Sequence, residues 1–175
     1  MSAQMSFVFV KQTGHVLAVL TQAAGAELQA TDVATPALSV RGFWDAGTQA
    51  FEDSIFKLTP DLLDVYTQDV LSPAETSPRT YSVDKEKKSV MLLSSPVKAL
   101  TATSQNVHLE LAIATGSKTK VFVICTTADP DNPDVRQPEI SGTETKFDFA
   151  VGPLPSQSYV LALVAGYLPI LAQVP

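Results

Sequence analysis

Short apolar runs, regularly separated by turn-forming residues, constrain the fold of this chain more than any other feature of its sequence. The runs are rich in Val, Ile, Thr, Phe and Tyr, and the segments between them are rich in Gly, Pro, Asn, Asp and Ser. β-branched and aromatic residues favour strands, whereas the intervening residue types favour turns. The sequence therefore predicts an all-β protein, and 175 residues with 45% hydrophobic content are enough for a buried core.

The first two runs predict a β-hairpin. SFVFVK (6–11) and HVLAVLT (15–21) flank a three-residue connection that ends in Gly14, and glycine adopts a positive φ more readily than other residues. The Ala-, Thr- and Gln-rich segment 22–37 has no periodicity and predicts a loop. ALSVRGF (37–43) predicts another strand.

The segment FEDSIFKLTPDLLDVYTQDVL (51–71) allows two interpretations. Its apolar residues recur at spacings of three and four, as on a helix face, but Pro60 would remove a backbone donor inside such a helix. Thr59 as N-cap and Pro60 as the first helical residue fit a short turn. We therefore expect a strand over 54–58, one helical turn over TPDLLD and a strand over VYTQDVL, with a longer helix over 60–70 as the alternative.

A second hairpin and a subdomain boundary follow. RTYSV (79–83) and SVMLL (89–93) flank the charged turn DKEKK, and the polar segment 94–104 separates them from the later strand patterns. We expect an N-terminal antiparallel β subdomain over residues 1–95 and a small Ig-like antiparallel β-sandwich over residues 96–175. The strands of the sandwich are expected in NVHLELAIAT, TKVFVICTT, TKFDFAV and SYVLALVAGYLPILAQV.

Charge and composition argue against several classes of partner and location. The net charge of −6 would repel a phosphate backbone, so neither DNA nor RNA is an expected partner. The start MSAQMSFVFVKQ has no early basic residue and a four-residue apolar core, which does not fit a secretory signal. The longest apolar run, 159–174, is too short for a bilayer and contains Gly166 and Pro169. With a single cysteine, these features predict a cytoplasmic protein without a membrane span.

The acidic loop DPDNPDVRQPE (129–139) is the strongest candidate metal site. Four carboxylates could converge there on a calcium ion: Asp129, Asp131, Asp134 and Glu139. An EF-hand loop needs an oxygen ligand at position 5 and glycine at position 6, whereas these positions hold Pro133 and Asp134 here. Because Asp, Asn and Pro also favour turns, we interpret the loop as a rigid inter-strand connection, with calcium binding as the alternative.

No motif predicts catalysis. The Gly-Ser-Lys-Thr string at 116–119 lacks the upstream glycine of a phosphate-binding loop and predicts a hairpin turn. His15 and His108 are far apart in sequence and have no other His or Cys nearby, and we expect both at surface or edge positions. Cys125 lies within VFVICTT, which predicts a buried thiol. We therefore expect a protein that is not an enzyme and holds no cofactor.

The C-terminal segment FDFAVGPLPSQSYVLALVAGYLP (147–169) resembles the closing strands of transthyretin-like and carboxypeptidase-regulatory-like β-sandwiches. The shared features are a strand with alternating aromatics, a Leu-Pro turn, a strand that begins at a tyrosine and a Gly-Tyr pair. Gln157 and Ser158 precede Tyr159, where that family usually has a glycine, and the family's opening motif is missing. The resemblance implies a sandwich fold and transfers no site residue.

The whole plan also resembles small proteins of phage-tail-like contractile injection systems. The features that carry this resemblance are the N-terminal hairpin, PDLLDVYTQDVLSP, a strand at Tyr81 and the terminal sandwich. It implies a place in an assembled multiprotein particle.

These observations predict a non-catalytic structural or assembly subunit that binds other protein subunits as a homo- or hetero-oligomer. Phe7 and Phe9, in a short apolar strand expected at a sheet edge, are candidate interface residues, as is the terminal strand that ends in Pro175. Trp44, beside Phe43, is a candidate aromatic anchor. The alternative is a carbohydrate- or calcium-binding module that uses Trp44 or the acidic loop.

Overall fold

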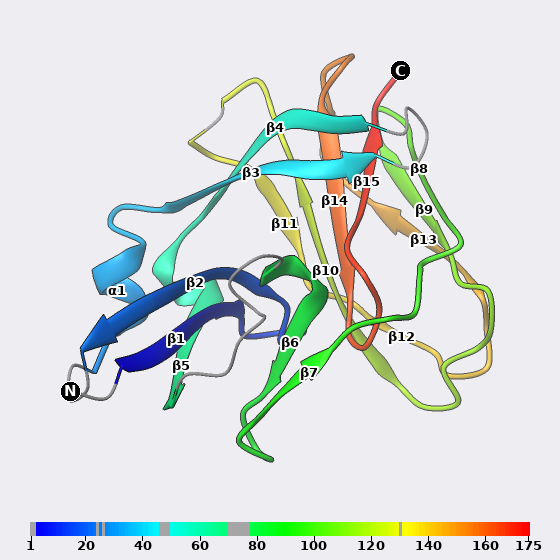
Figure 1. The fold of residues 1–175 in the computed structure, drawn as a ribbon. Coiled ribbons are helices and arrows are strands. Elements are labelled where there is room, and N and C mark those ends of the chain that lie inside the picture. Colours follow the sequence, from blue (N-terminus) through cyan, green and yellow to red (C-terminus); the bar gives the residue numbers. More distant parts are fainter. Residues whose placement is uncertain (1–2, 24, 26, 46–49, 70–77, 130) are drawn as a thin grey trace.

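The computed structural model of the chain describes residues 3–23, 25, 27–45, 50–69, 78–129 and 131–175. These residues form an all-β protein with four sheets, which confirms the predicted fold class (Figure 1). Within these ranges the α-helical content is one turn, α1 (Ala30–Val33), in a segment that we expected to be loop. The backbone N–H of Gln29 donates to the Asp32 carboxylate at 2.7 Å and holds the start of this turn.

The largest sheet has seven strands, in the order β11-β10-β14-β15-β3-β4, with β12 also paired to β10. Its pairs are antiparallel except for the joint between β15 and β3, which is parallel at Leu171 and Asp45. The strands are β3 (Leu38–Asp45), β4 (Ala50–Leu58), β10 (Thr119–Cys125), β11 (Asp134–Arg136), β12 (Glu139–Ile140), β14 (Tyr159–Val164) and β15 (Ile170–Gln173). This sheet contains strands from both of the expected subdomains, 1–95 and 96–175, and the division itself stays a prediction.

β10 and β14 are buried on both faces. Val121, Val123 and Cys125 point into one core, and Phe122 and Ile124 point into another. β14 alternates in the same way between the two cores. A strand covered on both sides needs apolar residues at every position, which explains the unbroken run VFVIC in the sequence.

A second sheet has three strands in the order β2-β1-β5, and β1 is its central strand. Its members are β1 (Ala3–Val10), β2 (Val16–Ala23) and β5 (Leu63–Asp69). β1 and β2 form the predicted hairpin, with Gly14 at φ +79° in the connection. The expectation that the first strand lies at a sheet edge is wrong, because β1 pairs along its length with β2 and β5, and the side chains of Phe7 and Phe9 are buried.

The terminal strand is not at an edge either. β15 lies between β14 and β3. β1 therefore has no free side, and β15 meets β3 at one described pair, Leu171 with Asp45. Since register and neighbours depend on contacts between distant segments, the sequence alone could not show which strands lie at the edges.

The ambiguous segment 51–71 follows the preferred interpretation over the residues that the structure describes. β4 ends at Leu58, a 3-10 turn η1 (Pro60–Leu62) begins after Thr59, and β5 starts directly behind it. Pro60 occupies the first position of the turn, where its missing N–H costs no hydrogen bond.

The remaining strands form two small sheets. A two-stranded sheet consists of β6 (Tyr81–Asp84) and β7 (Ser89–Leu92), the predicted second hairpin, and follows the 3-10 turn η2 (Pro78–Thr80). A three-stranded sheet, in the order β13-β9-β8, consists of β8 (Ala99–Ala102), β9 (Asn106–Glu110) and β13 (Lys146–Ala150). The strand expected over 106–115 ends at Glu110, and the loop expected over 129–139 contains β11 and β12, which pair with β10.

Three hydrophobic cores hold these sheets together. One lies between the β13-β9-β8 sheet and the large sheet, and its buried members all come from residues 97–174. A second combines N-terminal residues such as Val8 and Phe56 with Phe122 and Leu161. The third lies between the β2-β1-β5 sheet and the β6–β7 hairpin. No helix in the described ranges has the length and hydrophobicity to cross a bilayer.

Candidate functional site

A cleft of about 540 Å³ lies where three connections meet. The turn between β1 and β2 contributes residues 11–14, the β6–β7 hairpin contributes one face, and the turn after β14 contributes Ala165 and Gly166. Phe9, Val83 and Leu93 supply apolar surface, while charged residues of the hairpin tip line its mouth. The cleft therefore sits at the meeting point of segments that are far apart in sequence.

His15 directly follows the lining residues Thr13 and Gly14 and is fully buried, so the expectation of a surface or edge position for it is wrong. Its Nε2 is 2.7 Å from the carbonyl oxygen of Tyr167, which can only accept, so Nε2 carries the proton. Nδ1 then accepts from the Thr13 hydroxyl at 2.9 Å. Burial lowers the pKa of His15 from 6.5 to about 4, because the charged imidazolium would lose its hydration.

Two hydrogen bonds link the Thr13 hydroxyl, the His15 ring and the Tyr167 carbonyl in one chain. This order matches that of a nucleophile, a base and an orienting group. Acyl transfer also needs backbone donors aimed at a developing oxyanion. The backbone N–H groups of Thr13 and Gly14, which adjoin His15 in the chain, both donate to the carbonyl of Val10. We interpret the arrangement as a structural link that ties the first hairpin to the β14–β15 turn.

The outer edge of β7 presents unpaired backbone groups. Leu93 donates to the Thr80 carbonyl at 2.6 Å, so the hydrogen-bonded pairs of the hairpin are those at Ser89 and Met91. In an antiparallel ladder the residues between them point their N–H and C=O groups the other way. Val90 and Leu92 therefore face outward, and within the described chain neither has a backbone hydrogen bond.

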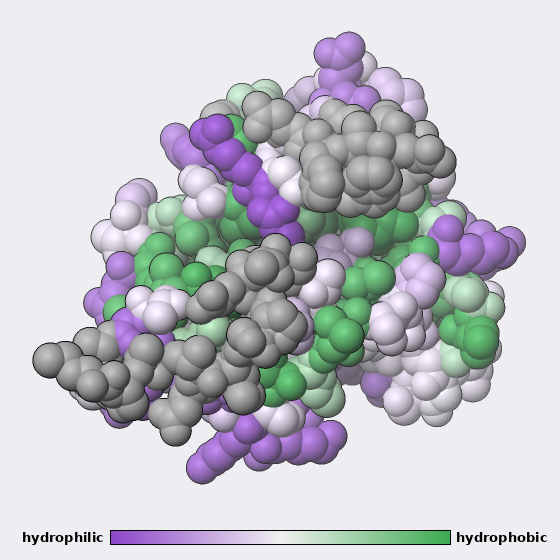
Figure 2. All heavy atoms as spheres, in the orientation of Figure 1, coloured by the Kyte–Doolittle hydropathy of each residue, from purple (hydrophilic) through white to green (hydrophobic). Residues whose placement is uncertain are grey.

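The side chains beside this edge are apolar and exposed. Met91 is 46% exposed and Leu92 is 65% exposed, whereas Val90 packs against the core below the hairpin. In Figure 2 hydrophilic residues cover the hairpin tip at the bottom of the view, and hydrophobic residues lie just above it, over β7. An apolar surface next to unpaired strand groups is a typical site for an added strand.

Ion pairs fix the hairpin tip. Lys85 pairs with Asp64 of β5, and Lys87 pairs with Asp84 at 3.1 Å. The backbone N–H and the ammonium group of Lys87 lower the pKa of Asp84. The Tyr66 hydroxyl donates to the Lys88 carbonyl at 2.8 Å. These contacts tie the hairpin tip to Asp64 and Tyr66 of β5.

The candidate calcium ligands do not form one site. Asp131 pairs with Lys57 of β4, and Asp129 accepts from the backbone N–H of Asp131 at 3.0 Å. Asp134 pairs with Arg136 at 3.0 Å and accepts from the N–H of Gly152 at 2.6 Å. Glu139 lies on β12, against β10. Over the described ranges, no group of three or more His, Cys, Asp or Glu residues is arranged to hold a metal ion.

Cys125 is fully buried at the end of β10, as the sequence predicts. Burial, with a smaller contribution from the charge of Asp134, raises the pKa of its thiol to about 12. The thiol therefore stays protonated near neutral pH, which does not suit a nucleophile.

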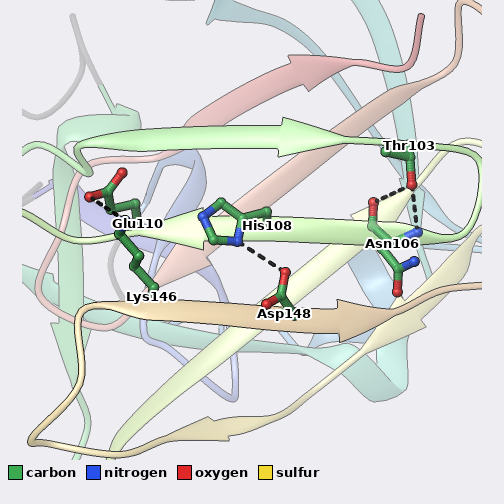
Figure 3. A network of polar contacts seen from close by, with 6 residues as sticks. All are labelled: Thr103, Asn106, His108, Glu110, Lys146 and Asp148. Atoms are coloured by element: carbon green, nitrogen blue, oxygen red, sulfur yellow. Dashed lines mark hydrogen bonds and ion pairs between the residues drawn. The ribbon is translucent and has the colours of Figure 1, made fainter.

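A polar face covers the outside of the β13-β9-β8 sheet (Figure 3). His108 Nδ1 lies 3.0 Å from Asp148 of β13, so this histidine is at the surface, as expected. Glu110 accepts from Lys98 at 2.8 Å, and this bond, with the more distant Lys146, lowers the pKa of its carboxyl. These are cross-strand pairs of the kind that stabilise an exposed sheet face.

Arg79 joins η2 to β3. Its guanidinium donates to the carbonyls of Arg41 and Gly42 and lies 4.4 Å from the ring centre of Phe43. Burial lowers the pKa of Arg79. The side chain of Trp44, the candidate aromatic anchor, lies outside what the structure describes.

Comparison of the chain with protein-family models, with curated proteins and with solved structures finds no match. The choice of the β7 edge as the candidate site therefore rests on its geometry alone. Its signal in the sequence is the uncharged run SVMLL directly after the charged turn DKEKK. The run predicts a strand, but the sequence does not show which side of that strand stays unpaired.

Proposed function

We propose that this chain is a non-catalytic assembly subunit that binds other protein subunits by strand addition at the outer edge of β7. The observation that carries the proposal is the pair of outward-facing residues Val90 and Leu92, whose backbone groups have no partner in the described chain. An extended protein segment can satisfy those groups with ladder hydrogen bonds.

The apolar side chains of β7 support the proposal. Met91 and Leu92 would lose much of their exposed surface under an added strand, which favours association through the hydrophobic effect. Proteins usually protect free edges with charges or proline. The segment from Ser89 to Leu93 contains neither.

A role without catalysis fits the chemistry of the cleft. The hydroxyl of Thr13 and both ring nitrogens of His15 are taken up by structural hydrogen bonds. Asp64 and Lys85, which both line the cleft, pair with each other, and the lining residue Asp84 pairs with Lys87, so three of the charged groups of the cleft already have partners. The resemblance to proteins of phage-tail-like contractile injection systems supports a multiprotein particle as the setting for this subunit.

Site-specific cross-linking tests the proposal. A photoreactive amino acid at position 91, in cells that naturally produce the protein, should give a discrete protein adduct. The same probe at Ile113, an exposed apolar residue away from the hairpin, is the matched control and should not give that adduct. An identical adduct from both positions would mean that exposure, and not the edge, directs the contact.

A pair of substitutions at Leu92 separates the edge from its side chain. Leu92→Pro removes an outward N–H and leaves the β6–β7 ladder intact, whereas Leu92→Ala keeps the N–H. We expect Leu92→Pro to reduce the position-91 adduct by about fivefold to tenfold relative to Leu92→Ala, the effect of losing one or two hydrogen bonds. Equal yields from the two variants would contradict strand addition.

A further inference from the structure

We propose that the strand added to β7 is β7 of a second copy of this chain, paired antiparallel around a two-fold axis at Met91. This inference rests on the proposed function, since it names the occupant of the same edge. It would create a continuous four-stranded sheet from two β6–β7 hairpins.

The donors and acceptors of β7 are self-complementary in this register. With the axis at Met91, Val90 lies opposite the partner's Leu92, and Leu92 lies opposite the partner's Val90. Both residues point their N–H and C=O groups outward, so each of these two pairs exchanges two hydrogen bonds. The result is four backbone hydrogen bonds without any change in the hairpin.

The side chains also fit a two-fold axis. Met91 falls in the non-hydrogen-bonded pair, where directly opposite side chains are closest, and therefore contacts the partner's Met91. No charged residue lies between Ser89 and Leu93, so no like charges meet across the axis. Because the strands are antiparallel, the two charged tips lie at opposite ends of the new sheet, and Lys85 and Lys87 of each tip already have acidic partners.

The other described edges are less suitable for a second copy. Charged residues occur in the edge strands β4, β5, β11, β12 and β13. β2 and β8 are uncharged, but β2 lies along η2 and β8 lies against β15. The main contacts of β7 within the described chain are with β6, which leaves its other side available.

The dimer should be weak. Four backbone hydrogen bonds and a few apolar side chains bury less than the roughly 800 Å² per partner of a standard stable interface. We expect a dissociation constant of about 1 to 100 µM. The association should be visible at the concentrations that analytical ultracentrifugation covers.

The test is sedimentation of the full chain from about 1 to 500 µM. The wild type should pass from monomer to dimer, and Met91→Lys should weaken dimerisation at least about tenfold, because it places two like charges together on the axis. Ile113→Lys, which adds the same charge to an exposed apolar position elsewhere, should leave the dissociation constant unchanged.

A charge-swap experiment is specific to the two-fold axis. Met91→Lys and Met91→Glu should each be largely monomeric alone and should associate with each other when mixed, because opposite charges then meet across the axis. A wild type that stays monomeric at about 500 µM, or a dimer that Met91→Lys does not weaken, would overturn the second copy as the occupant. In that case an adduct of the position-91 probe with a different protein would still support strand addition. If neither a dimer nor an adduct were found, the proposed function would be contradicted as well.

Discussion

His15 is a buried polar residue whose place in the fold could not be predicted from the sequence. It follows Gly14 just before β2, it is fully buried, and its Nε2 donates to the carbonyl of Tyr167, 152 residues further along the chain. A contact of that separation leaves no local signal. Burial disfavours the charged imidazolium and lowers the pKa of His15 to about 4.

The lowered pKa of His15 predicts a pH-dependent stability. The unfolded chain binds a proton near pH 6.5, and the folded chain does so only near pH 4, so the unfolded state binds more protons between these values. The stabilisation is complete above pH 6.5 and is lost as the pH falls towards 4. We expect the free energy of unfolding to drop by about 2 kcal/mol from pH 7 to pH 5 through this residue, measured by urea denaturation.

A histidine variant isolates that effect. His15→Gln has no titrating group in the buried site, so its unfolding free energy should change less with pH than that of the wild type, by the same amount of about 2 kcal/mol. Parallel pH profiles for wild type and His15→Gln would show that the buried imidazole is not the source.

At the scale of elements, the sequence predicted strands better than their neighbours. The first hairpin, the Thr59–Pro60 turn and the β6–β7 hairpin were recognisable because turn chemistry and local alternation act over a few residues. The short strands β11 and β12 were missed, since three and two residues carry no periodicity and form only against β10. α1 was missed because one helical turn also carries no periodic signal.

The β1–β2 turn packs closely against β6, and this contact makes a prediction about Gly14. A Cβ at Gly14 would lie 2.5 Å from the carbonyl oxygen of Val83, and its φ is +79°. Gly116 has a similar φ of +75° with open space around it, so Gly116→Ala tests the backbone conformation alone. Thermal denaturation should show a loss of about 1 kcal/mol for Gly116→Ala and about 2 to 4 kcal/mol for Gly14→Ala, which adds the clash. Equal losses would mean that the turn shifts away from β6 freely.

At the scale of the whole molecule, the site was harder to predict than the fold. Strand patterns indicated an all-β chain, but the edges were assigned to β1 and β15, which both proved internal. Edge positions depend on the order of strands in a sheet, and that order depends on contacts between both halves of the chain. The candidate site at β7 emerged only once those contacts were known, because an unpaired side is a property of the assembled sheet.

The core that the two halves share predicts that the chain unfolds as one unit. Leu109 of β9 packs within the core formed by residues 97–174. Phe122 of β10, the next strand in the sequence, packs with Val8 of β1 in the shared core. Leu109→Ala should cost about 2 to 5 kcal/mol. If the halves are coupled through the shared core, hydrogen exchange should show the same loss of protection in β1 as in β10, although Leu109 belongs to a different core from any β1 residue. Phe122→Ala, which removes a contact of the shared core itself, serves as the positive control. Loss of protection confined to residues 96–175 in Leu109→Ala would instead support two independently stable subdomains.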